Sequence, residues 1–177
     1  VLAGAIINEN GNAITNAYKG IYGSDFNNPK VISQSNYITL KANPAGGSQY
    51  GIKLVAGTSP TITLNNISGA SGLATNTLVT SIQTEQNNAP SVTCNTVSST
   101  GQGFEFSKSQ PDSVWKGNSM TNHSRGMLLN YTATIGQQGS AGNPIDNTWN
   151  GSWPFGTYNT WTDNGTFASN TNTLYVK

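Results

Sequence analysis

The chain has 177 residues, of which only 8% are charged, and its formal net charge at pH 7 is +1, whereas about 25% of the residues of an average soluble domain are charged. A chain of this length can bury the core of one domain without metal ions or disulfide bonds. Its 8 lysine and arginine residues are scattered, which argues against a nucleic-acid partner, and no apolar run approaches the ~20 residues that a membrane span requires.

The rest of the composition favours a folded, β-rich chain. Disorder goes with few aromatic residues and usually a high net charge, but this chain holds 4 Trp, 7 Tyr and 5 Phe. Its solubility depends on amides and hydroxyls instead, since Asn is its commonest residue type, and its 20 Gly indicate many turns. We therefore predict an all-β fold.

The first segment introduces a pattern that the rest of the chain repeats. An apolar run at 5–7 leads to the turn signal Asn10-Gly11 and then to the triplet Asn12-Ala13-Ile14. The next segment opens with a glycine followed by apolar residues, Gly20-Ile21-Tyr22, and again reaches such a triplet. Apolar and polar residues alternate in each short run, as they do in strands, and turn residues close each run.

Two sets of residues mark the period of this repeat. The asparagines that open the triplets recur at similar intervals along the chain; they are Asn12, Asn36, Asn65, Asn95 and Asn118. The glycines that open the apolar runs recur with the same period; they are Gly20, Gly51, Gly103 and Gly126. The long interval between Gly51 and Gly103 spans two repeats, because the run at 78–82 lacks the glycine.

The intervals fall within the range of about 20 to 50 residues that is typical of a solenoid, in which stacked repeats make the core together. No window shows the apolar spacing of a helix, which excludes helical repeats. Strands that return in the same direction once per repeat pair in parallel with their equivalents, about 4.8 Å away. We therefore predict a right-handed parallel β-helix of about five turns over residues 1–135. A β-sandwich, whose strands are also evenly spaced, is the alternative.

The recurring asparagine has a physical use in such a fold. An inward Asn at the same bend of every turn can bond its amide to the Asn above and below, and it can satisfy backbone groups at the corner. The five asparagines at this phase are therefore predicted to form a ladder, although a chain so rich in Asn places some of them at any phase.

The repeat is predicted to stop near Gly136, where residues 136–144 have the composition of a loop. The segment that follows is rich in aromatic residues and contains three of the 4 Trp; its aromatic side chains include Trp149, Trp153, Tyr158 and Trp161. The end of a β-helix exposes core and strand edges that must be covered. We predict that residues 136–177 form an aromatic cap of the same domain, with a last strand near 173–176. A surface for stacking sugars is the competing use of these aromatics.

Three motifs near the C-terminus carry a resemblance to a known family. They are SRGMLL at 124–129, ATIGQQG at 133–139 and NPIDNTWNG at 143–151. The chain resembles the end of the β-helix region in large secreted or surface proteins that bacteria export by the type IX pathway. The resemblance covers residues 103–153 in motifs and the earlier repeats only in architecture. It implies a scaffold and brings no catalytic residues, and no sorting domain of that pathway is recognisable here.

The acidic residues give no catalytic motif when they are read along the chain. A glycosidase needs two carboxylates across one bond, and adjacent repeats could bring Glu85 close to Glu105 or Asp112. Glu105 lies between Phe104 and Phe106, so alternation points it outward, where we expect a solvated acid. No cluster of acids with a basic residue or His on one face is predicted, and the chain is not expected to be an enzyme.

The remaining reactive residues have structural interpretations. His123, the single His, is expected in an exposed turn, and the single Cys94 is expected to be a small buried core residue. Asp146 with Asn143 and Asn147, and Asp163 with Asn164, are oxygen-rich turns that could hold Ca²⁺. Ordinary Asx turns are the commoner role for such residues, so no cofactor is predicted.

The sequence thus favours a structural or adhesive β-helix module of a secreted or cell-surface bacterial protein. Its expected partners are secretion-system components, neighbouring domains of the same polypeptide, or glycans. Because the chain begins at Val1, without an initiator Met or a signal segment, we expect a mature form or a piece of a longer protein. The alternative function is glycan binding, with weak polysaccharide cleavage at most, at Trp149, Trp153, Tyr158 and Trp161.

Overall fold

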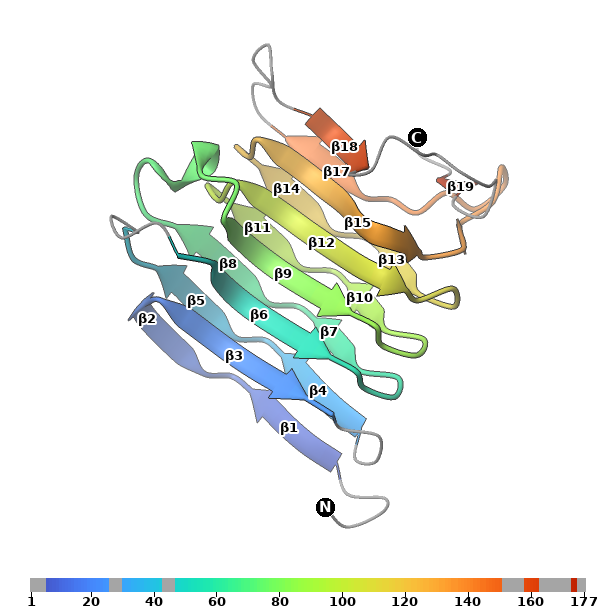
Figure 1. The fold of residues 1–177 in the computed structure, drawn as a ribbon, viewed down its shortest axis with the longest axis horizontal. Coiled ribbons are helices and arrows are strands. Elements are labelled where there is room, and N and C mark those ends of the chain that lie inside the picture. Colours follow the sequence, from blue (N-terminus) through green and yellow to red (C-terminus); the bar gives the residue numbers. More distant parts are fainter. Residues whose placement is uncertain (1–5, 26–29, 43–46, 151–157, 163–172, 175–177) are drawn as a thin grey trace.

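The protein is described by a computed structural model that covers residues 6–25, 30–42, 47–150, 158–162 and 173–174. Apart from one 3-10 turn, Leu73–Thr75, the regular elements in these ranges are β-strands (Figure 1). They form three large parallel sheets and one small parallel pair. The prediction of an all-β fold with parallel sheets is therefore confirmed.

Each large sheet takes one strand from every repeat. Sheet A contains β1 (Ile6–Asn10), β4 (Lys30–Gln34), β7 (Thr61–Thr63), β10 (Ser91–Thr93) and β13 (Val114–Lys116). Sheet B contains β2 (Ala13–Ala17), β5 (Tyr37–Leu40), β8 (Asn66–Gly69), β11 (Thr96–Ser98), β14 (Ser119–Thr121) and β17 (Thr148–Asn150). Sheet C contains β3 (Lys19–Ser24), β6 (Gln49–Val55), β9 (Val79–Glu85), β12 (Gln102–Ser109), β15 (Arg125–Thr134) and β18 (Tyr158–Thr162). The small pair is β16 (Gln137–Gln138) with β19 (Thr173–Leu174).

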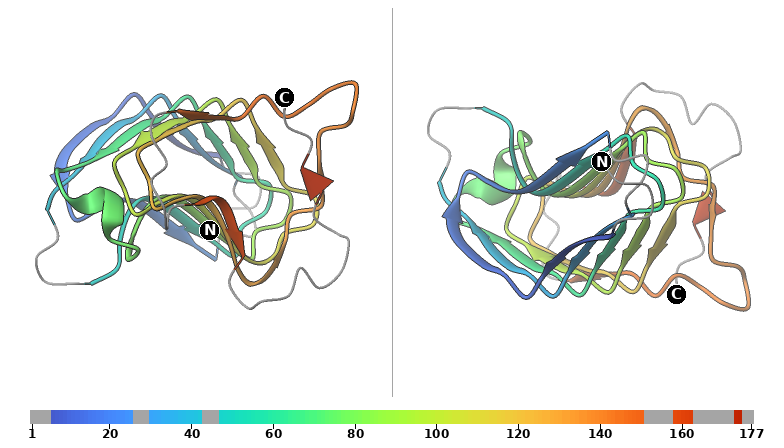
Figure 2. Two further views of the ribbon diagram at one scale, coloured as in Figure 1. Left: turned by 90° about the horizontal axis from the view of Figure 1, so that it is seen from above. Right: turned by 90° about the horizontal axis from the view of Figure 1, so that it is seen from below.

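The register repeats from one strand to the next. In sheet A, Val92 of β10 pairs with Ile62 of β7 on one side and with Trp115 of β13 on the other. All strand-to-strand pairings of the described elements are parallel, which excludes the β-sandwich, because its sheets are antiparallel. Figure 2 shows strands on opposite sides of a common interior.

The core lies between the sheets and consists of the inward-facing residue of each strand. In sheet B these residues are Ile38, Ile67, Val97 and Met120, and in sheet C they include Ile52, Ile82, Phe104 and Met127. All are at most 1% exposed. Because each repeat contributes only a few apolar side chains, the core depends on the stacking of neighbouring repeats.

The glycines of the repeat lie where two backbones approach closely. A Cβ at Gly103 would lie 2.5 Å from the carbonyl oxygen of Gly126, and one at Gly51 would lie 2.7 Å from that of Ser81. Glycine is therefore favoured at this position of sheet C, and Ser81 occupies the same position in the run that lacks a glycine.

Strand pairing continues past Gly136, where the sequence predicts the repeat to stop. β17 pairs with β14 and extends sheet B, while β18 pairs with β15 and extends sheet C. Inward packing also continues, because the ring of Trp149 lies 5.8 Å from that of Trp115 in an edge-on arrangement. No helix in the described ranges has the length and apolar character needed to span a membrane.

Candidate functional site

The structure brings the five asparagines of the predicted ladder together between sheets A and B. Each Oδ1 beyond that of Asn12 accepts two hydrogen bonds from the Asn one repeat earlier, one from its backbone N–H and one from its Nδ2. For Asn65 and Asn95 both distances are 3.0 Å. Asn147, which the sequence analysis assigned to a turn, adds a sixth member by accepting from Asn118 at 2.7 and 2.9 Å.

The residue before each ladder asparagine has a left-handed backbone conformation, which explains one wrong prediction. Cys94 (φ 56°), Leu64 (φ 57°) and Gly117 (φ 66°) all have positive φ values at this bend. The bend turns the asparagine inward and the preceding side chain outward. Cys94 is therefore exposed, not buried in the core as the sequence analysis expected.

A second row of buried amides, at the corner between sheets C and A, was not predicted. Asn87 donates from Nδ2 to the Leu54 carbonyl at 2.8 Å, and Gln110 donates from Nε2 to the Thr84 carbonyl at 3.0 Å. Gln138 donates in the same way to the Ser113 carbonyl at 2.8 Å. An amide at or near a turn of each repeat was the available signal, but the spacing varies, with 23 residues from Asn87 to Gln110 and 28 from Gln110 to Gln138.

His123 lies at the corner between sheets B and C and is 3% exposed, so the prediction of an exposed turn is wrong. Its Nδ1 lies 3.0 Å from the hydroxyl of Thr100 and 2.8 Å from the Thr100 carbonyl, and its Nε2 lies 3.2 Å from the Val97 carbonyl. Burial lowers the pKa of His123 below its ordinary value of 6.5, although the backbone contacts at Thr100 and Val97 oppose this shift. His123 is therefore a buried side chain that makes polar contacts at the corner between the two sheets.

This burial predicts a dependence of stability on pH. Below pH about 6.5 the unfolded chain binds a proton at His123 that the folded chain does not bind, so the free energy of unfolding should fall by up to about 1.4 kcal/mol per pH unit. The fall should end below the folded pKa. Urea unfolding between pH 7.5 and about 5 measures it, and His123→Gln should remove most of the slope. Glu85 does not interfere in this range, because its pKa lies below its ordinary value of 4.5. An unchanged slope in the variant would contradict the prediction.

Of the two oxygen-rich turns, the structure describes the one that contains Asn143, Asp146 and Asn147. No group of three or more His, Cys, Asp or Glu side chains lies together in the described part of the chain. Asn147 Oδ1 accepts two hydrogen bonds from Asn118 in the ladder. This candidate Ca²⁺ ligand beside Asp146 therefore already has hydrogen-bond donors. Asp163 and Asn164 lie outside the described residues.

The aromatic residues of the predicted sugar surface are only partly described. Trp149 is half-buried against the core next to Trp115. Tyr158 and Trp161 are residues of β18 and pair with Arg125 and Leu128 of β15. Trp153 lies outside the described residues. These positions do not bring the four aromatic residues into one described surface.

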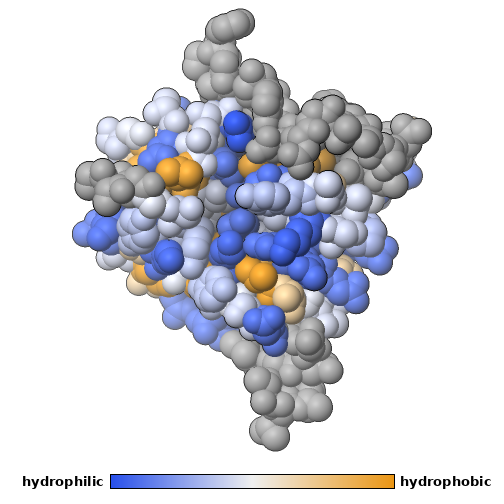
Figure 3. Space-filling view, viewed as in Figure 1, coloured by the Kyte–Doolittle hydropathy of each residue, from blue (hydrophilic) through white to orange (hydrophobic). Residues whose placement is uncertain are grey.

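The outward face of sheet C holds a large concave surface. It is a groove of about 600 Å³, and side chains of β6, β9, β12 and β15 line it. Figure 3 shows hydrophilic side chains over the centre of this face. Thr80 and Gln102 lie deep in the groove, at 5% and 6% exposure, and are joined by a 3.0 Å hydrogen bond.

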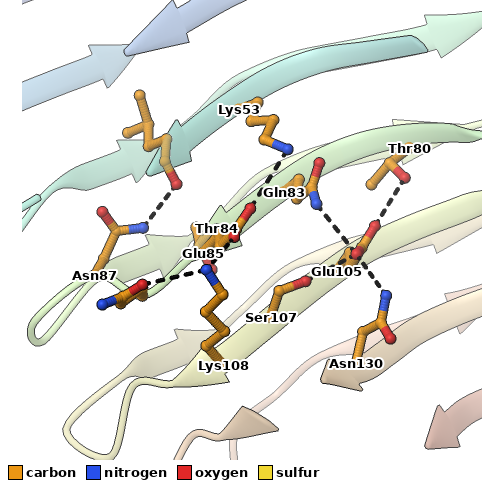
Figure 4. Close-up of polar contacts among 12 residues, drawn as sticks. Lys53, Thr80, Gln83, Thr84, Glu85, Asn87, Glu105, Ser107, Lys108 and Asn130 are labelled. Carbon is orange, nitrogen blue, oxygen red and sulfur yellow. Dashed lines mark hydrogen bonds and ion pairs between the residues drawn. The ribbon is translucent and has the colours of Figure 1, made fainter. Parts of the chain in front are cut away.

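Glu105 lines this groove, and hydrogen bonds from neighbouring side chains converge on its carboxylate (Figure 4). Its Oε1 accepts hydrogen bonds from Gln83 Nε2 (3.1 Å), Ser107 Oγ (2.9 Å) and Asn130 Nδ2 (3.0 Å), and its Oε2 accepts one from Thr80 Oγ1 (3.3 Å). Glu105 does point away from the core, as alternation predicts, but it is only 7% exposed. The prediction of a solvated acid is therefore wrong, because neighbouring side chains on β9 and β15 enclose the carboxylate.

Glu85 lies beside Glu105 on the adjacent strand. Glu105 pairs with Gln83, two residues before Glu85, which places the two Cα atoms roughly 8 Å apart. Lys108 Nζ lies 2.8 Å from Glu85 Oε1, and Lys53 Nζ lies 3.5 Å from Oε2. The hydrogen bond from Lys108, helped by the charges of both lysines, holds the pKa of Glu85 below its ordinary value although partial burial opposes this. Acids and basic residues thus do cluster on one face, contrary to the prediction.

Tyrosines flank the charged centre of the groove. The rings of Tyr22 and Tyr50 lie 6.0 Å apart with a 35° tilt, and Lys19 Nζ lies 5.5 Å from the centre of the Tyr50 ring. Burial, and then the neighbouring Tyr22, raise the pKa of Tyr50. At the other end, Tyr131 lines the groove and is 64% exposed.

The groove can therefore offer a ligand hydrogen-bonding amides, two carboxylates, cations and aromatic rings. Comparison of the chain with family models, with curated proteins and with solved structures finds no match. The resemblance to cargo of the type IX pathway thus stays a prediction.

Proposed function

We propose that this chain is a glycan-binding adhesive module whose groove on sheet C holds an extended polysaccharide. The observation that carries the proposal is the enclosed polar network around Glu105 in a groove that spans four strands. We further propose that the three sheets form a right-handed parallel β-helix of about five turns. Such a scaffold would hold the groove rigid.

Sugars match the chemistry of this groove. Their hydroxyls both donate and accept hydrogen bonds; ionised carboxylates can accept from them, and amides can do both. Gln83 and Asn130 are fixed by their bonds to Glu105, so they are already ordered before a ligand arrives. The apolar faces of sugar rings can lie against exposed aromatic rings such as Tyr131, as other apolar groups do.

Binding without cleavage is the function that the state of Glu85 favours. Hydrolysis of a glycosidic bond needs one carboxyl group that donates a proton. Glu85 is paired with two lysines and has a lowered pKa, so it is an ionised acceptor at neutral pH. We therefore propose a module that is not an enzyme.

The cellular location, export route and further partners of this module are proposed from the sequence. We propose an extracellular location, secreted or at the cell surface, with the type IX pathway as the export route that the C-terminal motifs favour. Residues 136–177 are proposed to cap the solenoid, and the packing of Trp149 against Trp115 supports this role for one aromatic residue. Neighbouring domains and secretion components are then additional partners.

Tyr131→Ala tests the proposed site. We expect the variant to bind the glycan about three- to tenfold more weakly, the size of a lost aromatic contact, and to unfold like the wild type because Tyr131 is exposed. Tyr37→Ala is the matched control, since Tyr37 is 48% exposed but lies on sheet B. The measurement is a glycan array followed by titration with the best glycan.

Two results would contradict the proposal. One is that no glycan binds the wild-type chain. The other is that Tyr131→Ala and Tyr37→Ala weaken binding equally, which would place the glycan elsewhere.

A further inference from the structure

The charged side chains of the described strands are concentrated on the face that holds the groove. Lys53, Lys108 and Arg125 line the groove, and Lys19 lies on the same sheet. The outward positions of sheet B from β5 to β17 are uncharged; they are Tyr37, Thr39, Asn66, Ser68, Thr96, Ser98, Ser119, Thr121, Thr148 and Asn150. In a chain with a net charge of +1, this distribution gives one face a local excess of positive charge.

The two carboxylates of the groove are less accessible than Lys108. Glu85 is shared by two lysines, and its side chain is 21% exposed, whereas that of Lys108 is 48% exposed. Glu105 is 7% exposed, and its oxygens accept from neutral donors. A ligand that approaches the groove therefore meets the Lys108 ammonium before it meets either carboxylate.

The cations of the groove lie in two places: Lys53 and Lys108 meet at Glu85, and Arg125 lies at the start of a different strand. Lys53 is on β6, Lys108 is near the end of β12, and Arg125 begins β15. β6 and β15 are three strands apart, which is about 14 Å at 4.8 Å per strand. A single small anion cannot contact both ends of this distance, but a polymer that carries one acidic group on each of several units can.

We infer that the ligand of the groove is an acidic polysaccharide, with carboxylate or sulfate groups that pair with Lys53, Lys108 and Arg125. This inference rests on the proposed function. A nucleic acid is also an anionic polymer, but its recognition generally needs a larger basic excess. Here two carboxylates accompany the three cations of the groove, which suits a polymer of lower charge density.

The test compares four polymers with the full chain: polygalacturonate for carboxylate, dextran sulfate for sulfate, unmodified dextran as the neutral arm, and poly(dT) for nucleic acid. A panel of other neutral glycans accompanies the dextran. We expect binding to polygalacturonate or dextran sulfate, weakened by added salt, and the better of the two identifies the acidic group. Lys108→Gln should weaken that binding about two- to fivefold, the size of one exposed ion pair.

Lys116→Gln is the matched control, because Lys116 is exposed on β13 of sheet A, away from the groove. Equal weakening by both variants would mean unspecific attraction and would overturn the inference. The inference would also be wrong if poly(dT) bound more tightly than the acidic polysaccharides. It would be wrong again if neutral glycans bound as tightly as the acidic ones and Lys108→Gln left their binding unchanged. If neutral glycans bind as tightly as the acidic polymers, the proposed glycan-binding function still holds and only the preference for acidic groups is wrong. If the chain binds neither neutral nor acidic glycans, the proposed function and this inference are both wrong.

Discussion

Replacement of Asn95 by alanine is expected to lower the free energy of unfolding by about 3 kcal/mol, because it leaves buried polar groups without partners. Asn95 Oδ1 accepts from the backbone N–H and the Nδ2 of Asn65, and its Nδ2 donates to Ile62 O and to Asn118 Oδ1, all at 3.0 Å. The variant removes these four bonds at a residue that is 1% exposed. Chemical denaturation followed by circular dichroism measures the loss.

Asn66→Ala is the matched control for the ladder. Asn66 follows ladder residue Asn65 directly, but its side chain is exposed on sheet B. Its replacement should change the free energy of unfolding by no more than about 0.5 kcal/mol. If both variants lose the same stability, asparagine content and not the buried row stabilises the fold. A loss below about 1 kcal/mol in Asn95→Ala would also remove the ladder from the account.

The parallel strands could be predicted from the sequence because residues that stack in this fold obey the same local constraint in every repeat. Each ladder asparagine bonds to the next one, so the column keeps one residue type. The glycine column keeps glycine because a side chain would meet the backbone of the next strand, as at Gly103. Both columns therefore remain visible although the spacing of the asparagines varies from one repeat to the next.

The groove could not be found by reading the acids along the chain. Its residues are neighbours across strands, and Glu105 lies 22 residues after its donor Gln83. Aligning the repeats on the glycine column would have revealed it, since the position two residues later holds Tyr22, Lys53, Gln83, Glu105 and Leu128. The ladder amides lie at bends between strands and face the interior, whereas the amides that enclose Glu105 lie on strands, on the outward face of sheet C.

His123 and Cys94 show where local composition misleads. Polar neighbours led to the prediction that His123 is exposed, and the usual burial of a free cysteine led to the opposite prediction for Cys94. Their places in the repeat decide otherwise: His123 follows Asn122 (φ 60°) and faces the interior, whereas Cys94 (φ 56°) is itself at the left-handed bend. The backbone conformation at a bend determines which side chain turns inward, and the local amino-acid composition does not indicate that conformation.

Trp115→Ala is expected to cause the largest loss of stability, about 4 kcal/mol, because it opens a cavity in the core. Trp115 is fully buried, and its ring lies edge-on to those of Phe104 (5.8 Å), Phe106 (6.3 Å) and Trp149 (5.8 Å). These contacts join sheets A, B and C near the C-terminal end of the core. Guanidinium unfolding followed by far-UV circular dichroism should be used, since the substitution alters the fluorescence itself.

Trp115→Phe separates packing from hydrogen bonding at the same position. Trp115 Nε1 has no hydrogen-bond partner among the described residues, so the smaller apolar ring should lose only part of the packing, about 1.5 kcal/mol. Val114→Ala, at the exposed neighbour on β13, should change stability by less than about 0.5 kcal/mol. If Trp115→Phe were as costly as Trp115→Ala, the indole N–H would have to be bonded in solution.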